Sequence, residues 1–119
     1  MNYRFVPAQP NAYIECISDS TPISSAQDAL DLVAGCGEYG VSRLLIPESC
    51  LNEDFYNLKS GLLGEILLKF SNYRIKAAAV IPPERVGKGK FYEFTLETNR
   101  GRDFRTFTDD QKAVDWLVK

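Results

Sequence analysis

The stretch "LKSGLLGEILLKFSNYRIKAAAVIPP" (residues 58–83) decides the fold of this chain. Its first half places apolar side chains at helical spacing, and its second half is continuously apolar from Ala77 to Ile81 before two prolines. The first pattern predicts an amphipathic helix, and the second predicts a buried central strand. The apolar positions of the helix are Leu62, Leu63, Ile66, Leu67 and Phe70. A helix that leads into a buried strand is typical of an α/β sheet.

The start of this helix has two interpretations. In one, the helix runs without a break from Asn52, which is a good N-cap residue. In the other, the chain breaks near residues 59–61 and the helix starts at Ser60, whose hydroxyl then caps a free amide. An unbroken helix would contain Gly61 and Gly64, each costing about 1 kcal/mol relative to alanine. We therefore favour the break, which leaves free amides and a positive dipole end beside Ser60.

Shorter patterns predict the other elements of the chain. Apolar and β-branched residues indicate strands at 3–6, 12–17, 41–47 and, as an edge strand, 103–108. Helical spacing and capping residues indicate helices at 24–35, 91–101 and 109–119. The resulting order predicts a single α/β domain over residues 1–119, with a mixed, mostly parallel sheet of about five strands and about four helices.

Local signals bound some of these elements. Ser24 followed by Gln27 matches a capping box at the first helix, and Gly35 and Gly37 predict its end. The segment 82–90, rich in proline, glycine and lysine, predicts a loop. The next segment, at 91–101, has a second interpretation as a strand, because its aromatic residues suit either element.

Charge and composition set limits on partners and location. The chain has 14 basic and 16 acidic residues and a formal net charge of -2, so neither a nucleic acid nor an anionic membrane is the expected partner. No apolar run approaches the roughly 20 residues that a membrane-spanning helix needs. The N-terminal residues lack the basic-then-apolar pattern of a signal peptide, so we expect a cytoplasmic protein.

The chain has no histidine, which removes the commonest general base and metal ligand. Its cysteines, at positions 16, 36 and 50, lack the close pairing of a zinc site. We expect reduced, mostly buried thiols, with Cys50 the best candidate for a reactive one because it lies in a loop after a strand. We therefore expect neither a metal nor a cofactor.

Four segments carry a resemblance to a known family. They are "ISSAQDALDL" (23–32), "LNEDFYNLKSGLLGEILLKFSNYR" (51–74), "ETNRG" (97–101) and "AVDWL" (113–117). Together they resemble an uncharacterised bacterial family of small proteins, the domain of unknown function DUF4180, over nearly the whole chain. That resemblance implies an α/β domain and no particular activity.

A more distant resemblance is to STAS-type domains, the SpoIIAA-like fold of anti-sigma-factor antagonists. Those proteins carry an Asp-Ser-Ser-Gly-Leu segment at the start of a helix after a central strand, and the serine before the glycine is phosphorylated. Here Ser60 and Gly61 take the positions of that serine and glycine, while Leu58 and Lys59 replace the two residues before them. The resemblance implies a STAS-like fold and a regulatory, protein-binding module with a phosphoacceptor or anion site at Ser60, Gly61 and Lys59. The expected partner is another protein, and a second copy of the chain is a further candidate.

Four other polar residues are candidates for a pocket or partner surface. Glu48 follows the carboxyl end of a strand, where α/β sheets tend to bind ligands. Glu65 lies on the same helix as the apolar stripe, and Asn99 and Arg100 end a helix. Arg100 could pair with either glutamate or hold an anion. We expect a partner-facing surface over residues 48–61 with Arg100 nearby.

Two alternatives to the regulatory module stay open at this stage. The first is a small-molecule binding protein with an anionic or apolar ligand at the carboxyl edge of the sheet. The second is an enzyme that uses Glu48 or Glu65 as a base and Arg100 as an anion clamp, which requires these side chains to share one pocket.

Overall fold

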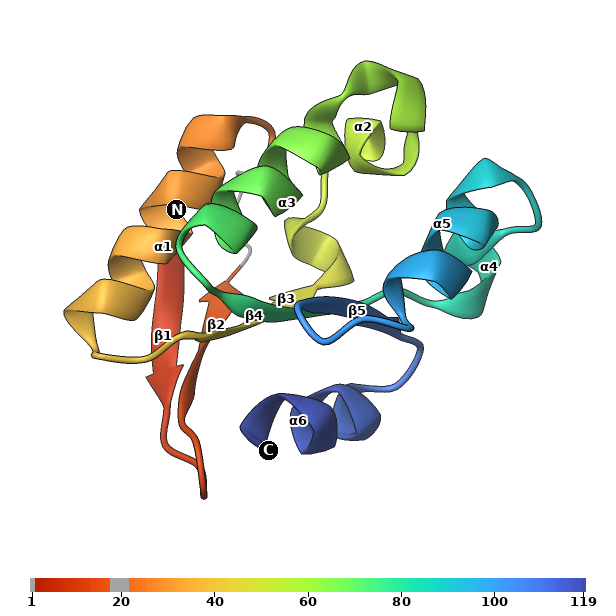
Figure 1. Ribbon diagram of the computed structural model, residues 1–119. Coiled ribbons are helices and arrows are strands. Elements are labelled where there is room, and N and C mark those ends of the chain that lie inside the picture. Colours follow the sequence, from red (N-terminus) through yellow and green to blue (C-terminus); the bar gives the residue numbers. More distant parts are fainter. Residues whose placement is uncertain (1, 18–21) are drawn as a thin grey trace.

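The computed structural model describes residues 2–17 and 22–119 (Figure 1). Within these ranges the strands form one five-stranded sheet in the order β1-β2-β3-β4-β5. The strands are β1 (Asn2–Val6), β2 (Tyr13–Ile17), β3 (Arg43–Pro47), β4 (Lys76–Val80) and β5 (Phe104–Phe107). Only the β1–β2 pair is antiparallel. The predicted mixed, mostly parallel sheet of five strands is therefore confirmed, including the edge position of β5.

The described residues contain six α-helices, two more than expected. They are α1 (Ala26–Glu38), α2 (Glu53–Tyr56), α3 (Leu62–Asn72), α4 (Pro83–Val86), α5 (Lys90–Thr98) and α6 (Asp110–Val118). The additional helices, α2 and α4, are single turns: α2 lies before the predicted break, and α4 lies in the segment predicted as a loop. The α2 turn forms because the Asn52 side chain accepts a hydrogen bond from the amide of Asp54 at 2.8 Å. The α4 turn begins at Pro83, whose ring favours the first position of a helix.

The helices form two layers around the sheet. Helices α1, α3 and α5 cover one face, and α6 alone covers the other (Figure 1). Each helix–strand unit lies beside the previous one, because the strand order follows the sequence. The larger core is on the three-helix side and includes Ile14, Leu44, Ile46, Ala77, Ala79, Phe55, Ile66 and Phe70. The smaller core lies under α6 and consists of Tyr13, Leu45, Ala78, Ala113 and Leu117. None of the helices in residues 2–17 and 22–119 combines the length and apolar character that crossing a bilayer requires.

The cap of α1 differs from the predicted capping box. Ser25 is the N-cap residue, and its hydroxyl accepts a hydrogen bond from the amide of Asp28 at 3.3 Å. The Asp28 carboxylate in turn accepts a hydrogen bond from the amide of Ser24 at 2.9 Å. The predicted pair of Ser24 and Gln27 is therefore wrong by one residue, since Asp28 makes the return contact that was expected from Gln27.

The end of α1 is also later than predicted. The helix continues through Gly35 and Gly37 to Glu38, and Gly40 follows with a φ of +66°. Gly35 serves packing rather than termination, because a Cβ atom there would lie 2.6 Å from the ring of Tyr3 on β1. The left-handed Gly40 is the residue that turns the chain away from the helix.

Replacing Gly35 by alanine should lower the free energy of unfolding by about 1–3 kcal/mol, because the Tyr3 ring must move to admit the methyl group. Gly37→Ala is the matched control, since a Cβ atom there meets open space in the same helix. That change should leave stability equal or raise it by up to about 1 kcal/mol through helix propensity. Urea unfolding followed by circular dichroism measures both variants, and equal effects would contradict the packing role of Gly35.

Candidate functional site

The chain breaks between α2 and α3, as predicted. Helix α2 ends at Tyr56, a 3₁₀ turn follows over Leu58–Ser60, and α3 begins at Leu62. The residue between them, Gly61, has a φ of +79°. Residues other than glycine adopt this left-handed backbone conformation only with strain. The helix therefore starts two residues later than the expected start at Ser60.

The Ser60 side chain joins the two sides of this break. Its hydroxyl donates a hydrogen bond to the backbone carbonyl of Asp54 at 2.7 Å and accepts one from the amide of Leu62 at 3.2 Å. The expected hydroxyl cap on a free amide is thus present, although Gly61 is the residue at the N-cap position. Ser60 is exposed, so both hydrogen bonds lie at the protein surface.

Charged side chains of both signs surround Ser60 in sequence. Lys59 and Glu65 are exposed, and Glu65 lies in the first turn of α3. Helix α3 also presents the amides of its first turn, which have no acceptor within the helix. The helix dipole and Lys59 therefore favour an anion near Ser60, while Glu65 opposes it.

Arg85 holds α2 from its other side. One guanidinium nitrogen of Arg85 lies 2.8 Å from each carboxylate oxygen of Glu53, and the guanidinium stacks 4.2 Å from the centre of the Tyr56 ring. The hydrogen bonding to Glu53 raises the pKa of Arg85. This contact was not predicted, because Arg85 lies in the segment 82–90, which the sequence predicts as a loop. The only sequence signal for it is the acidic and aromatic character of residues 53–56, since Glu53 and Tyr56 are side chains that an arginine can contact.

A surface hollow of about 400 Å³ lies beside the break. Its lining residues are Tyr56, Asn57, Leu58, Lys59, Gly89, Lys90 and Phe91. Two lysines and two aromatic rings thus meet where the turn before α3 approaches the start of α5. This hollow and the Ser60 hydroxyl form the candidate site, which we call the α2–α3 junction.

The other predicted site residues do not join this group. Glu48 lies at the carboxyl edge of the sheet, where β3, β4 and β5 end, in a hollow of about 350 Å³ that Val80 and Asp110 also line. Arg100 precedes β5 and therefore lies at the opposite, amino edge. Its ion-pair partner is Glu97 at 4.0 Å, and both side chains are about four-fifths exposed. The expectation that Arg100 lies near the 48–61 surface is wrong, and Glu48 and Arg100 cannot act in one pocket.

Asn99 has a structural position. Its side-chain amide donates to the carbonyl of Thr106 at 3.2 Å and accepts from the amide of Thr106 at 2.8 Å. Because β5 is the edge of the sheet, these bonds pair a strand that has no further neighbour on that side. Asn99 therefore ties the end of α5 to β5 rather than lining a pocket.

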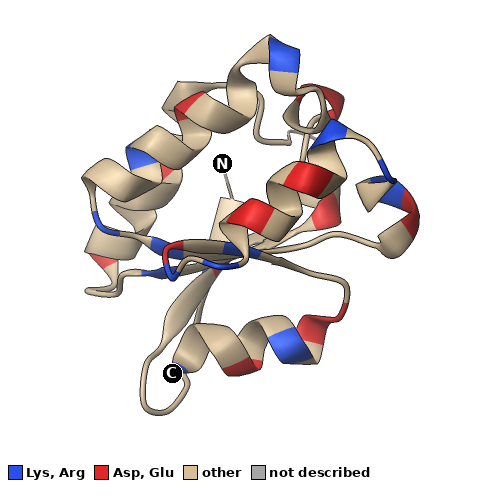
Figure 2. Cartoon of the chain, turned by 45° about the vertical axis from the view of Figure 1, so that its right-hand side comes forward, with Lys and Arg blue, Asp and Glu red and all other residues tan. Residues whose placement is uncertain are grey.

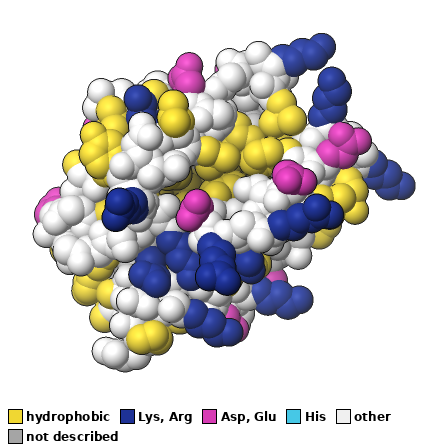
Figure 3. Space-filling model, viewed as in Figure 1, with side chains coloured by type: hydrophobic (Ala, Val, Ile, Leu, Met, Phe, Trp, Pro, Cys, Tyr) yellow, Lys and Arg dark blue, Asp and Glu magenta, His cyan; other side chains and the backbone are white. Residues whose placement is uncertain are grey.

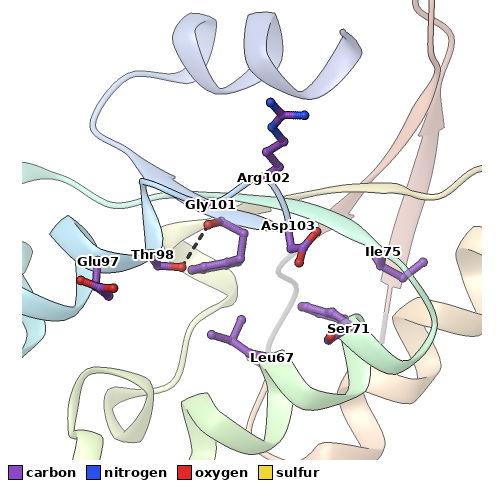
Figure 4. Close-up of a pocket in the computed structure, with 10 residues that line it drawn as sticks. Leu67, Ser71, Ile75, Glu97, Thr98, Gly101, Arg102 and Asp103 are labelled. Carbon is purple, nitrogen blue, oxygen red and sulfur yellow. Dashed lines mark hydrogen bonds between the residues drawn. The ribbon is translucent and has the colours of Figure 1, made fainter.

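A third hollow opens at the amino edge, between α3 and α5 (Figure 4). Its volume is about 270 Å³, and its apolar lining is Leu67, Phe70, Ile75 and Phe104. Leu67 and Ser71 come from α3, Glu97 and Thr98 come from α5, and the Arg102 side chain points away toward α6 (Figure 4). The hollow therefore offers a mainly apolar surface with carboxylates at its rim.

The three thiols are buried and form no disulfide. The expectation of mostly buried thiols is confirmed, and Cys50, the expected candidate for a reactive thiol, is itself fully buried in the larger core. Hydrogen bonding with Cys50 and burial raise the pKa of Cys16, and burial raises the pKa of Cys36 to about 11. Within the described parts of the chain, no group of three or more cysteine, aspartate or glutamate side chains is placed to hold a metal ion.

Gly61→Ala should lower the free energy of unfolding by about 1 kcal/mol or more, because alanine is strained at a φ of +79°. Gly64→Ala is the matched control, three residues along in α3 with no atom within 4 Å of an added Cβ. That change should be neutral or stabilising by up to about 1 kcal/mol. Chemical unfolding of the two variants distinguishes these outcomes. If Gly61→Ala is as stable as Gly64→Ala, the left-handed turn is not present in solution.

Comparison with known proteins adds one finding. The sequence profile of the family described as Domain of unknown function (DUF4180) matches residues 8–117. No curated protein matches the chain. The match includes strands β2 to β5, helices on both faces of the sheet and the whole α2–α3 junction.

Proposed function

The chain belongs to the DUF4180 family, and on that premise we propose that it is a non-enzymatic regulatory module that binds another protein through the α2–α3 junction. The observation that carries this proposal is the Ser60 hydroxyl, which is exposed and yet holds two segments together. The buried thiols without a disulfide fit a reducing bacterial cytoplasm as its location.

The Ser60 hydroxyl is suited to a switch because it donates as well as accepts. A phosphate ester or a carboxylate at this position has no proton to give to the Asp54 carbonyl, so the 2.7 Å contact would become a repulsion between oxygens. The 3₁₀ turn would then separate from α2. Modification would therefore change the shape of the junction surface while leaving the sheet and its cores intact.

The start of α3 offers a new place for such a charge. The first-turn amides and the positive end of the dipole of an 11-residue helix stabilise a negative group, typically by 0.3–1 kcal/mol at an exposed site. Lys59 adds a positive charge beside it. A phosphate on Ser60 would thus lose the contact with the Asp54 carbonyl and keep the amides at the start of α3, one of which, that of Leu62, already donates to the Ser60 oxygen, so the junction has two alternative arrangements.

The position of this serine supports a STAS-like interpretation of the fold. Helix α3 is the first helix longer than one turn after β3, the third strand of five, and Ser60-Gly61-Leu62 leads into it after the single turn α2. A central strand, a break and a Ser-Gly-Leu helix start are the arrangement that the resemblance implies. On this interpretation Ser60 is the phosphoacceptor, and Gly61 and Lys59 belong to the same site.

The proposal predicts that Ser60→Asp changes partner binding without unfolding the protein. Tagged wild-type, Ser60→Ala and Ser60→Asp chains would be used to purify partners from native cells, with quantitative mass spectrometry of the bound proteins. Ser49→Asp is the matched control, because Ser49 is also exposed but lies in the turn after β3. We expect the recovery of at least one protein to change several-fold with Ser60→Asp and to stay constant with Ser49→Asp.

Two results would contradict the proposal. One is an identical set of recovered proteins for all variants whose circular dichroism spectra match the wild type. The other is a change that Ser49→Asp reproduces, since that would reflect added charge rather than the junction. Recovery of a second copy of the chain as the Ser60-dependent partner would make the interaction a homodimer.

A second candidate function is the binding of a small apolar ligand. The observation that favours it is the hollow between α3 and α5, whose lining is mainly apolar (Figure 4). It lies at the amino edge, whereas the ligand was expected at the carboxyl edge beside Glu48. Native mass spectrometry of protein purified from its own cells tests this candidate. A retained small mass supports it, and a protein mass without ligand opposes it.

A further inference from the structure

Three cations gather on the α6 face of the sheet, at its amino edge. Arg43 begins β3, Lys76 begins β4, and Arg105 is the second residue of β5. Arg43 and Lys76 are direct partners across two parallel strands, and Arg105 is opposite Ala78, two residues along β4. We call these three side chains the cationic cluster. Lysine and arginine side chains gather between the sheet and α6 in the space-filling view, and the same edge is marked by basic residues in the cartoon (Figures 2 and 3).

The cluster is anchored by hydrogen bonds to backbone carbonyls. Arg43 Nε donates to the carbonyl of Leu117 at 2.7 Å, and Lys76 Nζ donates to the carbonyl of Trp116 at 2.8 Å. Arg105 Nε donates to the carbonyl of Gly101 at 2.8 Å. The Trp116 ring also lies among them, 4.4 Å from Lys76 Nζ and 5.1 Å from the Arg105 guanidinium. All three side chains are half-buried, so their directions are fixed before any ligand binds.

The positive charge of the cluster exceeds what its surroundings neutralise. The ion pairs within the described residues join Arg4 to Glu15, Arg85 to Glu53 and Arg100 to Glu97, and none involves the cluster. The C-terminal end of α6 supplies about half of a negative charge, against three full positive charges. Like charges directly opposite on neighbouring strands are also unfavourable. Capping α6 therefore explains two of the contacts but leaves most of the charge uncompensated.

The pKa of Lys76 reflects both its burial and the positive charges around it. Burial lowers the pKa of Lys76, and neighbouring positive charges lower it further. Those charges belong to Arg43, Arg105 and Lys119. The exposed Arg102 side chain also points toward α6, which adds positive charge to the same region (Figure 4). An anion seated here would remove a repulsion that the folded chain otherwise contains.

We propose that the cationic cluster is a binding site for the phosphate group of a small anionic ligand. Each arginine uses its Nε atom on the protein, which leaves the two terminal nitrogens of each guanidinium to face an anion. Paired N–H groups of this kind match phosphate oxygens in a bidentate arrangement, and several cations suit a doubly charged group. The net charge of -2 over the whole chain favours a compact ligand over a long polyanion, because the field away from the cluster is not positive.

The test is a titration of the full chain with inorganic phosphate, followed by ¹H–¹⁵N NMR at constant ionic strength set with chloride. We expect saturable shifts centred on residues 43, 76, 105 and the Trp116 indole. Arg105→Gln should weaken phosphate binding about tenfold, the usual scale of one charge-assisted contact, because it removes a cation and leaves both α6 carbonyl contacts in place. Arg105→Lys keeps the charge without the paired N–H groups and should weaken binding less.

Lys112→Gln is the matched control, since it removes the same unit of charge from the first turns of α6, away from the cluster. Its phosphate affinity should stay within about twofold of the wild type. The proposal is overturned if phosphate gives only the non-saturable shifts that chloride gives, or if Lys112→Gln weakens binding as much as Arg105→Gln. The wild-type titration decides the first point even if Arg105→Gln does not fold. The proposal is also overturned if a single-stranded oligonucleotide displaces phosphate from the cluster at a concentration well below that of the phosphate, because the ligand would then be a nucleic acid and not a small molecule.

Discussion

The left-handed turn at Gly61 is the constraint on which the three-helix side of the protein depends. It lets the chain change direction between α2 and α3, so that both helices contribute to one core. Phe55 of α2 is fully buried against the Phe91 ring of α5, while Ile66 and Phe70 of α3 lie over the sheet. A continuous helix would carry its first turns straight past the sheet and could not bury both sets of side chains. The Ser60 hydroxyl fixes this change of direction at the surface, where a chemical modification can reach it.

The sheet separates two regions that could bind ligands or partners. Because the helices run antiparallel to the parallel strands, the start of α3 lies toward the carboxyl edge, and the end of α6 lies at the amino edge. The Ser60 turn is on the three-helix side, and the cationic cluster is on the α6 side. The two proposals therefore rest on different residues and different faces, and either can fail without the other.

Much of the fold could be predicted from local patterns. Continuous apolar runs identified β3 and β4, and the Ser60-Gly61 pair identified the break before α3, because these signals are contained within a few neighbouring residues. The single turns α2 and α4 were missed because one turn is too short to show helical periodicity. Gly35 was misread as a helix end because its role is set by Tyr3, which is far away in sequence.

The candidate site was harder to predict because it depends on the relative placement of distant elements. Ser60, Gly61 and Lys59 are neighbours in the chain, so the sequence alone places them together. The sequence alone does not show that Arg100 and Glu48 lie at opposite edges of the sheet. That placement follows only once β5 is known to run parallel to β3, because Arg100 precedes β5 and Glu48 follows β3. The cationic cluster depends on the register between β3, β4 and β5, which no single segment encodes.

The most direct test of this account is the backbone conformation of residues 53–72 in solution, measured by NMR of ¹³C,¹⁵N-labelled protein. We expect helical chemical shifts and medium-range Hα–HN contacts in 62–72, an interruption at 57–61, and a positive φ at Gly61. Unbroken helical contacts from Glu53 to Phe70, with a negative φ at Gly61, would contradict the account.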